Sequence, residues 1–596
     1  MAGSVKFNID GVTINKRIAE SIARNPLRPA LSSKAGKEWI TLTFRDFDER
    51  VRQFSLGLRA LGIERGDRVA LLSENRVEWA VADVAVLAAG AITVPIYTTL
   101  PASQVAHILA DSGSKAIFAS DTKQLAKAEI SSARCPDLKI FITMEPGGAK
   151  GDVMSFQQVI EEGSRYKAEE KFEERRDSVR PSDLASLVYT SGTTGDPKGT
   201  MLSHQNFAAA VGMAEIAFPI YPTDSFLSFL PLCHVFERVT HYLSLSIGSH
   251  TSYAESIFKV QENLAEVQPV VMQSVPRLFE AMYERITETI EKSPEKQKKV
   301  ALWALSVGKK HADRLNKGAI IDPLLASQHA IADKLVLSKI RQRLGGKLRF
   351  FVSGGAPLSA ETADFFNSIN IPILEGYGLT ETTAPLTCNP FHRAKVGTVG
   401  TAFAAVTLKI AQDGEILAKG PNVMSGYWNS PGATHEMFDS EGWFKTGDIG
   451  RLDSTGYLTI TDRKKDIIVL ANGKNVAPQP IESRLKQSPL ISEVVLLGDN
   501  AGTISALVLP NFEKLSAWGR EAGLDFDDHT SIAMSTEVRK KIKKEIDGLS
   551  VDLADFEKIR KIALLAEPLT IDKGELTPTL KVRRKVVFER YGKLLD

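Results

Sequence analysis

The stretch Tyr-Thr-Ser-Gly-Thr-Thr-Gly-Asp-Pro-Lys-Gly, residues 189–199, follows a short apolar run from Leu184 that predicts a strand. It combines four hydroxyl side chains from Thr190 to Thr194 with three glycines and Lys198. The glycines allow backbone conformations that are closed to other residues, so that N–H groups can turn toward a bound anion. The hydroxyls add donors and the lysine adds a positive charge. The stretch therefore predicts a loop that holds the polyphosphate of a nucleotide.

Two other interpretations of this loop are less well supported. A Walker loop has the pattern Gly-x-x-x-x-Gly-Lys-Ser/Thr and runs into a helix. Here only two residues separate Gly195 from Lys198, and one of them is Pro197. A turn rich in Gly, Ser and Thr can also be a flexible linker, but the density of the pattern directly after a strand favours phosphate binding.

Composition excludes several classes of protein. Of 596 residues, 43% are hydrophobic and 24% charged, as in ordinary soluble globular proteins. The net charge of +2 is too small for a chain that binds nucleic acid along its length. Three cysteines far apart in the sequence exclude a disulfide framework and a Cys-x-x-Cys metal site, and the expected compartment is a reducing cytoplasm. They are Cys135, Cys233 and Cys388.

No segment has the pattern of a signal peptide or a membrane span. The first 24 residues contain no apolar core of the signal-peptide type. The longest weakly polar stretch, Val81 to Tyr97, is interrupted by Asp83 and Pro95 and falls short of the ~20 apolar residues that a span needs. It predicts a buried helix followed by a strand. Peripheral contact with the inner face of a membrane stays open.

Strand and helix patterns alternate over the first two thirds of the chain, which predicts α/β layers with largely parallel sheets. A charged helical region follows at 277–343, and short β-rich segments follow residue 400. The all-charged run 462–466 is either a solvated turn or a linker. We expect a large multi-sheet N-terminal domain at 1–462, a hinge at 463–466 and a small mobile α+β C-terminal lid domain at 467–596. Predicted strands are 68–73, 116–120, 139–143, 184–190, 270–275 and 348–353; predicted helices include 47–61 and 78–88.

Three further motifs suit nucleotide binding. Residues 351–359, Phe-Val-Ser-Gly-Gly-Ala-Pro-Leu-Ser, follow a strand and have small side chains against which a flat ring can lie. Residues 375–383, Glu-Gly-Tyr-Gly-Leu-Thr-Glu-Thr-Thr, offer a tyrosine that can stack on a base and a carboxylate suited to magnesium. Residues 443–450, Trp-Phe-Lys-Thr-Gly-Asp-Ile-Gly, offer an aspartate that can accept hydrogen bonds from ribose hydroxyls.

Together with the loop at 189–199 and the Asp-Arg-Lys-Lys-Asp run, these motifs resemble those of the adenylate-forming superfamily, which includes acyl-CoA synthetases, adenylation domains and luciferases. The resemblance covers nearly the whole chain and implies ATP, Mg²⁺ and coenzyme A as ligands. It implies that Glu381, with Thr190, holds the metal. The implied ATP- and AMP-binding residues are Thr190, Ser191, Gly192, Thr193, Thr194, Gly195, Lys198, Gly355, Ala356, Glu375, Gly376, Tyr377, Gly378, Thr380, Asp448 and Arg463.

The resemblance also assigns residues to the reaction. A lone histidine in an apolar run is usually packed in a core, but Leu-Pro-Leu-x-His matches the family's acid-side histidine and places His234 near the carboxylate and α-phosphate. Lys581, in Leu-Thr-Pro-Thr-Leu-Lys, matches the catalytic lysine, although Leu580 replaces the usual glycine; Lys573 is the competing candidate. Lys465 matches the hinge residue. The segment 472–482 matches the one that enters the site for thioester formation, with Gly473 and Lys474 as CoA contacts.

The implied function is an ATP-dependent long-chain fatty acid–CoA ligase of bacterial type. The carboxylate and ATP give acyl-AMP and pyrophosphate, and the CoA thiol then gives acyl-CoA and AMP. Alternatives are a stand-alone fatty acyl-AMP ligase that loads a carrier protein, a CoA ligase for a medium-chain or aromatic acid, and a binding protein without catalysis. Luciferase-like oxygenation is disfavoured, and no nucleic-acid partner is expected. The sequence indicates neither the oligomeric state nor the length of the acyl chain.

Overall fold

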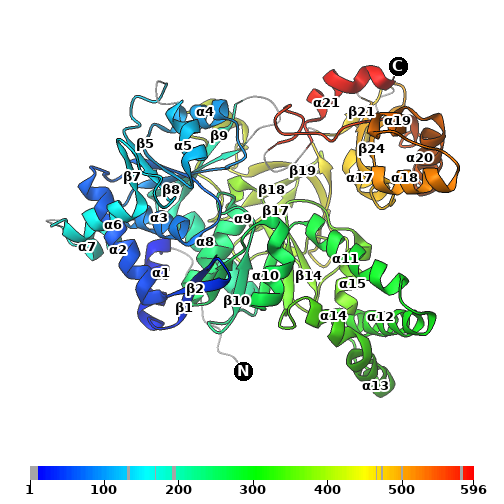
Figure 1. Cartoon of the computed structure of the whole chain (residues 1–596), viewed down its shortest axis with the longest axis horizontal. Helices are drawn as coiled ribbons and strands as arrows, with labels where there is room; N and C mark the ends of the chain where they lie inside the picture. The colour runs from blue at the N-terminus through cyan, green and yellow to red at the C-terminus, as the bar shows by residue number, and fades with distance from the viewer. Residues whose placement is uncertain are drawn as a thin grey trace. The chain divides into compact units, whose positions relative to one another are not determined.

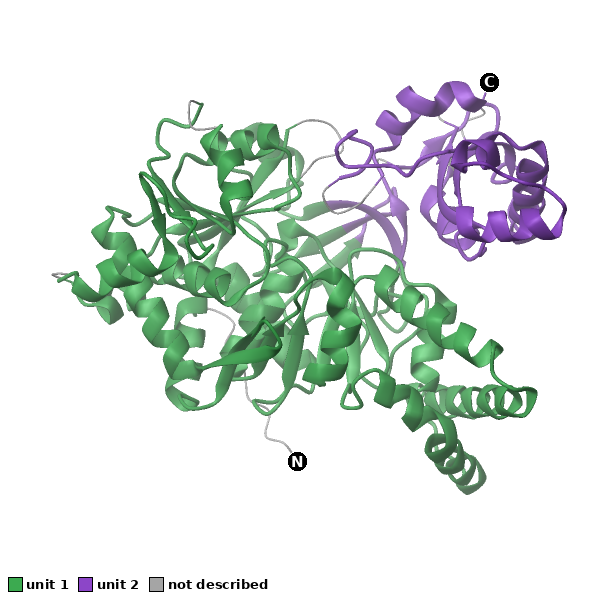
Figure 2. Ribbon diagram, viewed as in Figure 1, with its two compact units in different colours: residues 1–409, 417–445, 452–459 green, residues 410–416, 446–451, 460–596 purple. Residues whose placement is uncertain are grey.

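The computed structural model describes residues 11–130, 134–167, 170–190, 196–464, 466–471, 474–498, 501–577 and 582–595. The chain divides into two compact units (Figure 2). Unit 1 comprises residues 1–409, 417–445 and 452–459, and unit 2 comprises residues 410–416, 446–451 and 460–596. The expected mixed α/β architecture is confirmed, with several sheets in the larger unit and a small α+β unit (Figure 1).

Two large sheets organise unit 1. Among the described residues, nine strands form one sheet in the order β16-β15-β14-β13-β12-β10-β11-β1-β2. Its central pairs, from β1/β11 to β13/β14, are parallel, and antiparallel pairs occur toward both edges. The bounds are β1 Pro29–Ala35, β2 Glu38–Thr43, β10 Ser225–Ser228, β11 His250–Tyr253, β12 Val271–Ser274, β13 Phe350–Ser353, β14 Ile373–Tyr377, β15 Thr387–Cys388 and β16 Thr401–Ala402.

The second sheet has the order β7-β6-β5-β3-β4-β8-β9. It is parallel except for its last pair, because β8 and β9 form an antiparallel hairpin. The prediction of largely parallel sheets is thus confirmed, and the return strand β9 is an element that the sequence did not predict. The bounds are β3 Arg68–Leu72, β4 Ile92–Ile96, β5 Ser114–Ala119, β6 Ile140–Thr143, β7 Val153–Ser155, β8 Leu184–Thr190 and β9 Lys198–Ser203.

Helices cover both sheets, and one buried core includes residues from each of them. Val69 and Val188 of the second sheet belong to the same core as Phe226 and Phe350 of the first. The helices of unit 1 are α1 Ile14–Arg24, α2 Phe44–Ala60, α3 Val77–Ala88, α4 Ala102–Ser112, α5 Thr122–Glu129, α6 Phe156–Arg165, α7 Phe172–Asp177, α8 His204–Ala217, α9 Val235–Ile247, α10 Val260–Val267, α11 Pro276–Glu291, α12 Glu295–Asn316, α13 Pro323–Ala332, α14 Ser338–Arg343, α15 Ala360–Ser368 and α16 Pro431–Glu436.

The smaller sheets lie in the last third of the sequence. A four-stranded sheet has the order β17-β18-β19-β20, β21 and β22 form a ribbon, and a three-stranded sheet has the order β23-β24-β25. Their bounds are β17 Thr407–Ile410, β18 Glu415–Lys419, β19 Phe444–Leu452, β20 Leu458–Arg463, β21 Ile468–Val469, β22 Asn475–Val476, β23 Ile491–Leu497, β24 Ile504–Pro510 and β25 Ile559–Leu564. The helices of unit 2 are α17 Pro478–Leu485, α18 Phe512–Glu521, α19 His529–Met534, α20 Thr536–Leu549 and α21 Arg584–Tyr591.

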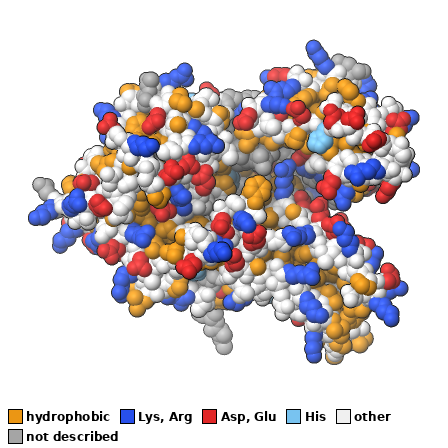
Figure 3. Space-filling view, viewed as in Figure 1, with side chains coloured by type: hydrophobic (Ala, Val, Ile, Leu, Met, Phe, Trp, Pro, Cys, Tyr) orange, Lys and Arg blue, Asp and Glu red, His pale blue; other side chains and the backbone are white. Residues whose placement is uncertain are grey.

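The charged run 462–466 is not simply a solvated turn. Strand β20 continues through Arg463, and the side chain of Asp462 is buried. Burial raises the pKa of Asp462 to about 7, against the opposing effect of a hydrogen bond from the N–H of Arg463. Elsewhere on the surface, basic and acidic side chains are interspersed over the visible face (Figure 3).

One ion pair lies fully inside unit 1. The guanidinium of Arg238 on α9 donates to the carboxylate of Asp83 on α3, and both side chains are completely buried. Arg238 also donates to Thr93 on β4, to Ser186 on β8 at 2.8 Å and to Tyr242 at 2.9 Å. These bonds join two helices to two neighbouring strands of the second sheet.

We predict that Arg238→Met destabilises the protein by about 3–5 kcal/mol, because it leaves the carboxylate of Asp83 buried without its cation. Chemical denaturation at neutral pH measures the change. Lys292→Met, which removes the exposed partner of Glu288, is the matched control and should change stability by less than about 1 kcal/mol. Equal losses in the two variants would contradict the prediction.

Candidate active site

The predicted phosphate loop connects the two strands of the β8–β9 hairpin. Thr190 and Lys198 are directly opposite each other in the register of this hairpin. Cross-strand partners share one face of a sheet, so the hydroxyl and the ammonium lie on the same side. Residues 191–195, with the predicted contacts Ser191, Gly192, Thr193, Thr194 and Gly195, lie outside the described residues.

Hydrogen bonds fix the base of this loop from outside the hairpin. The hydroxyl of Tyr189 donates to the carboxylate of Asp111 at 2.6 Å. The indole N–H of Trp428 donates to the carbonyl of Asp111 at 3.1 Å, and Nε2 of His107 lies 3.0 Å from the carbonyl oxygen of Pro197. Because both ends of the loop are held, its flanking strands cannot shift without breaking several bonds.

Tyr427 links Lys198 to Glu381. The ammonium of Lys198 lies 5.6 Å from the centre of the Tyr427 ring, within cation–π range. The hydroxyl of the same ring donates to Oε1 of Glu381 at 2.7 Å. The backbone of Tyr427 forms a β-bridge with Thr200 on β9. Two predicted site residues that are far apart in the sequence therefore meet at one side chain that the sequence did not indicate.

The residues around Glu381 suit a magnesium ion that is shared with a substrate. Glu381 lies in a 3-10 turn, η4 (Thr380–Thr382), which contacts β9. Within the described residues no group of three or more His, Cys, Asp or Glu side chains could hold a metal. A single carboxylate near a phosphate loop fits Mg²⁺, which usually keeps several waters and binds through one or two carboxylates and substrate phosphates. Thr190 and Glu381 both have side-chain oxygen atoms, the kind of ligand that this ion prefers.

The two predicted adenine motifs lie at one edge of the first sheet. Strands β13 and β14 are parallel neighbours with Ser353 opposite Glu375, and each motif begins within its strand and continues past the strand's carboxyl end. Ligands of α/β proteins bind beyond this carboxyl edge. The buried Glu375 carboxylate accepts a hydrogen bond from the N–H of Leu358 at 3.2 Å, which ties the 354–358 turn to β14. Burial raises the pKa of Glu375 to about 7, partly offset by that N–H.

Backbone geometry explains two of the glycines in these motifs. Gly355 has a φ of +85°, which favours glycine, and it is exposed together with Ala356. At Gly378 a Cβ atom would lie 1.2 Å from the carbonyl oxygen of Ala384, so no other residue fits. Gly376 and the half-buried Tyr377 are adjacent to it at the end of β14.

His234 forms the N-terminal cap of α9. Its Nδ1 accepts a hydrogen bond from the N–H of Phe236 at 3.1 Å, so the neutral imidazole carries its proton on Nε2. The ring of Phe236 lies against Gly354, where an added Cβ would be 3.2 Å away. His234 is therefore a half-buried cap residue and not a packed core histidine, and the 354–356 turn is contacted by Phe236 two positions later.

Unit 2 contains the predicted ribose pair. Nε of Arg463 lies 3.1 Å from Oδ1 of Asp448, whose side chain is buried. Asp448 follows Gly447, which has a φ of +72° and donates its N–H to Glu415 at 3.0 Å. Lys464 forms ion pairs with Asp413 and Glu415. The two members of the predicted pair, 15 positions apart, are thus brought together.

The C-terminal motifs are only partly described. Lys465, Gly473 and Lys581 lie outside the described residues. Lys474 is exposed, with its ammonium 4.5 Å from the centre of the Phe556 ring. Lys573, the competitor of Lys581, forms an ion pair with Glu567 at 2.7 Å.

A buried carboxylate lies next to the β-bridge between Leu576 and Val582. Leu576 and Val582 form a β-bridge on either side of residues 578–581. Beside this bridge, the side chain of Glu575 accepts hydrogen bonds from Tyr591, Arg590 and the N–H of Thr570. Burial alone would raise the pKa of Glu575, but these bonds outweigh it and hold the pKa below its usual value.

Comparison with known families decides the assignment. Residues 18–428 match the family described as AMP-binding enzyme, and residues 465–596 match the AMP-binding enzyme C-terminal domain. The chain belongs to the AMP-binding enzyme family. The predicted membership of the adenylate-forming superfamily is thereby confirmed, and the expected class of AMP-forming acid–thiol ligase agrees with it.

Relatives of this AMP-binding enzyme cover nearly its full length. The long-chain-fatty-acid–CoA ligase FadD15 of Mycobacterium bovis is 38% identical over 566 residues, which are 93% of this chain and 91% of the relative. The long-chain-fatty-acid–CoA ligase ACSBG2 of Homo sapiens is 31% identical over 617 residues, 98% of this chain and 92% of the relative.

Solved structures agree with the fold of this AMP-binding enzyme. The adenylation domain of a carboxylate reductase from Mycobacterium chelonae has a TM-score of 0.75 at 23% identity, covering 98% of this chain and 90% of that chain. The corresponding domain from Segniliparus rugosus, in complex with AMP and a co-purified carboxylic acid, has a TM-score of 0.75 at 21% identity. The match covers 98% of this chain and 93% of that chain.

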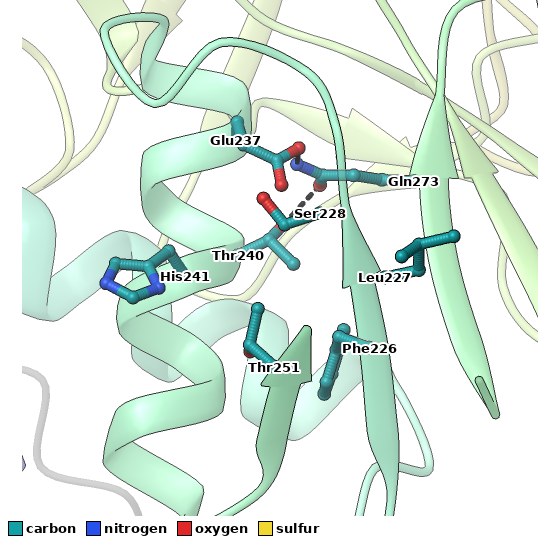
Figure 4. Close-up of a pocket in the computed structure, with 8 residues that line it drawn as sticks. All are labelled: Phe226, Leu227, Ser228, Glu237, Thr240, His241, Thr251 and Gln273. Atoms are coloured by element: carbon teal, nitrogen blue, oxygen red, sulfur yellow. Dashed lines mark hydrogen bonds between the residues drawn. The ribbon is translucent and has the colours of Figure 1, made fainter. Parts of the chain in front are cut away.

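A buried polar cluster lies beneath α9 of this AMP-binding enzyme (Figure 4). Glu237 and Thr240 point toward Gln273 on β12, and Gln273 forms a hydrogen bond with each of them. The cavity among the lining residues is about 10 Å³, room for roughly one water molecule. Burial raises the pKa of Glu237 to about 7, although hydrogen bonds with Ser228 and Gln273 oppose the shift. Burial lowers the pKa of His241 to about 3, so that ring stays neutral.

Sequence patterns missed four residues with notable contacts in the structure. Tyr427 stands in an ordinary Ser-Gly-Tyr-Trp stretch, and its link to Glu381 spans 46 positions. Glu237 looks like a common acidic residue in the first turn of a helix. Arg238 and Glu575 show no motif at all. Only the nearness of Tyr427 to a Gly-rich turn could have suggested a role.

We predict that Tyr427→Phe lowers kcat/KM for ATP about tenfold or more in pyrophosphate release. The variant keeps the ring beside Lys198 but removes the hydroxyl that orients Glu381, and a hydrogen bond to a charged group contributes about 1.5–3 kcal/mol. Tyr166→Phe, a half-exposed tyrosine away from this hairpin, is the matched control. An unchanged kcat/KM in Tyr427→Phe would refute the role of the hydroxyl.

We also predict a pH-dependent effect of Glu237→Gln. The folded pKa of Glu237 is raised to about 7 from 4.5, so its contribution to stability is full below pH 4.5 and is lost as the pH rises to about 7. The neutral glutamine loses nothing, so the variant should gain up to about 3 kcal/mol relative to wild type between these pH values. Denaturation at a series of pH values measures the difference. Glu436→Gln, at an exposed position, is the control. An equal change in the pH dependence of stability in this control would contradict the raised pKa of Glu237.

Proposed function

We propose that this chain is an ATP-dependent fatty acid–CoA ligase whose substrate is a long-chain acid. The observation that supports this best is the β8–β9 hairpin, where Lys198 and Glu381 meet at Tyr427 beside the predicted triphosphate loop. A carboxylate is a poor electrophile, because its negative charge repels nucleophiles. Transfer of AMP to the carboxylate converts one of its oxygens into part of a good leaving group.

The first step brings a carboxylate anion to a triphosphate that is already negative, so electrostatic stabilisation is the main requirement. Lys198 and the hydroxyls from Thr190 onward bind the β- and γ-phosphates. His234, with its Nε2 proton, orients the carboxylate and an α-phosphate oxygen. When bound, Mg²⁺ offsets phosphate charge through oxygen ligands from Glu381 and Thr190.

The remaining groups bind the nucleotide and stabilise the negative charge that develops while AMP is transferred. Tyr377 and the 355–356 turn bind adenine, and Asp448 with Arg463 binds the ribose hydroxyls. Lys581 bridges the carboxylate and the α-phosphate, where negative charge accumulates in the transition state. Precise placement of the two reactants supplies much of the remaining rate enhancement.

In the second step the thiol of CoA attacks the acyl-adenylate. We propose that the lid domain, residues 467–596, rotates about Lys465, which withdraws Lys581 and brings the 472–482 segment to the site. Gly473 and Lys474 then contact CoA. Lys581 thus serves the first half-reaction, and the 472–482 segment serves the second.

The acid class is supported by relatives. Relatives at 31% and 38% identity are named long-chain-fatty-acid–CoA ligases and match over more than nine tenths of this chain. The bacterial relatives and the cysteine usage favour a cytoplasmic site of action. No described helix combines the length and apolar character that a membrane crossing requires.

We predict that AMP and pyrophosphate release rises with acyl chain length and requires CoA. Each buried CH₂ contributes about 0.8 kcal/mol, so kcat/KM should rise about fourfold per added carbon until the acyl site is full. The measurement uses unbranched acids from two to about twenty carbons, with and without CoA, at one ionic strength.

Lys581→Ala and Lys573→Ala provide matched control variants for this assay. We expect Lys581→Ala to lose adenylation but still convert a supplied acyl-adenylate and CoA to acyl-CoA, while Lys573→Ala keeps both activities. Acyl-AMP that accumulates regardless of CoA would point to a carrier-loading ligase. No turnover with any acid would refute the ligase assignment.

A further inference from the structure

Helices α12 and α13 extend from unit 1 beyond the two large sheets (Figure 1). We call residues 295–337 the helical projection; it comprises α12, α13 and the π-helical turn η3 (Asp333–Leu337). Only a narrow strip of α12 is buried, formed by small residues such as Ala301 and Ala304. Most of the surface of both helices therefore faces solvent.

Large apolar side chains are exposed along this projection. On α13 the exposed Leu324 and Ile331 are seven positions apart, which places them on one face of the helix, and Ile320 and Leu335 lie shortly before and after it. On α12 the exposed Leu302 and the partly exposed Trp303 add to the apolar area. The exposed fractions on and beside α13 are 88% for Ile320, 68% for Leu324, 54% for Ile331 and 47% for Leu335.

The helical projection also has a net positive charge. Residues 295–337 contain eight Lys and Arg but only four Asp and Glu, a surplus of four positive charges in a chain whose total is +2. The rest of the protein is thus net negative. Figure 3 shows hydrophobic and basic side chains together at the end of the projection.

Charged and apolar groups meet in one groove of about 530 Å³ between α12 and α13. Lys310, Arg314 and Lys317 line it from α12 and its end, and Leu324 lines it from α13. Among the described residues no ion pair involves Lys310 or Lys317, so both ammonium groups remain available to an anion. Asp313 and Asp322 also line the groove, and Asp322 already caps α13 by accepting from Leu325.

We propose that the helical projection docks on the surface of a bilayer that contains anionic lipid. The apolar side chains on α13 enter the boundary between headgroups and acyl chains, while Lys310, Arg314 and Lys317 contact lipid phosphates. An anionic membrane surface attracts basic residues. An apolar face with a tryptophan suits the interfacial region of a bilayer. An exposed apolar row this long favours a lipid surface over a nucleic acid, which would be contacted mainly by charges.

This docking goes beyond the proposed ligase function, since catalysis on a dissolved acid does not require it. The test is co-sedimentation of the full chain with vesicles of phosphatidylcholine, alone or with roughly 30% phosphatidylglycerol. We expect at least tenfold tighter binding to the anionic vesicles. We also expect that binding to be lost in ~1 M salt, where screening acts over about 3 Å.

Two double variants separate the charged and apolar contributions. Lys310→Glu with Lys317→Glu, and Leu324→Ser with Ile331→Ser, should each weaken binding to anionic vesicles at least about tenfold. All four side chains are exposed, so the fold should persist. Pyrophosphate release with a short, dissolved acid should be unchanged in both, which separates failure of docking from failure of the ligase assignment.

The control variants make the same changes elsewhere on unit 1. They are Lys123→Glu with Lys139→Glu, and Leu27→Ser with Ile216→Ser, all at exposed positions. Wild-type vesicle binding in the projection variants, or equal loss in the controls, would overturn the proposal. So would binding to neutral vesicles that salt does not weaken. Self-association that Leu324→Ser with Ile331→Ser abolishes, without any vesicle binding, would assign the surface to a second copy of the chain.

Discussion

The buried guanidinium of Arg238 fixes the geometry on which the rest of unit 1 depends. It connects α9 to Asp83 on α3 and to Ser186 and Thr93 on neighbouring strands. Strand β8 contains Ser186 and ends at the phosphate loop, and His234 caps α9 about one turn before Arg238. The spacing between the loop and the histidine is therefore set by one charged group that has no access to solvent. A buried pair of this kind gives directional contacts that an apolar core alone would lack, whatever its net contribution to stability.

Much of this organisation could be predicted from the sequence because local patterns determine it. Alternating apolar and helical segments predicted the strands β3, β5, β6, β8, β12 and β13, and the interrupted run 81–97 is indeed a buried helix followed by a strand. Gly355 and Gly378 were recognised within motifs, and their φ angle and close contact explain why glycine is needed there. In each of these cases the cause lies within a few residues.

Contacts between distant segments could not be predicted in this way. Tyr427 acquires its position from a bridge to Thr200, more than two hundred positions away, and the return strand β9 exists because its edge pairs with β8. Burial is equally invisible in a local pattern: Asp462 belongs to an all-charged run, and Glu237 to the first turn of an amphipathic helix. Both carboxyl groups have a pKa of about 7 because the folded chain removes water from them.

The pairing of Thr190 with Lys198 also restricts how this segment can change in evolution. Surface loops generally tolerate insertions and deletions. A slip of β9 against β8 by one position would turn every side chain of β9 to the opposite face. Lys198 would then leave Tyr427, and the anchor at Pro197 would be lost as well. The register of the hairpin is therefore as strictly constrained as the identity of its residues, because a change elsewhere in the segment that shifted it would displace an unaltered Lys198.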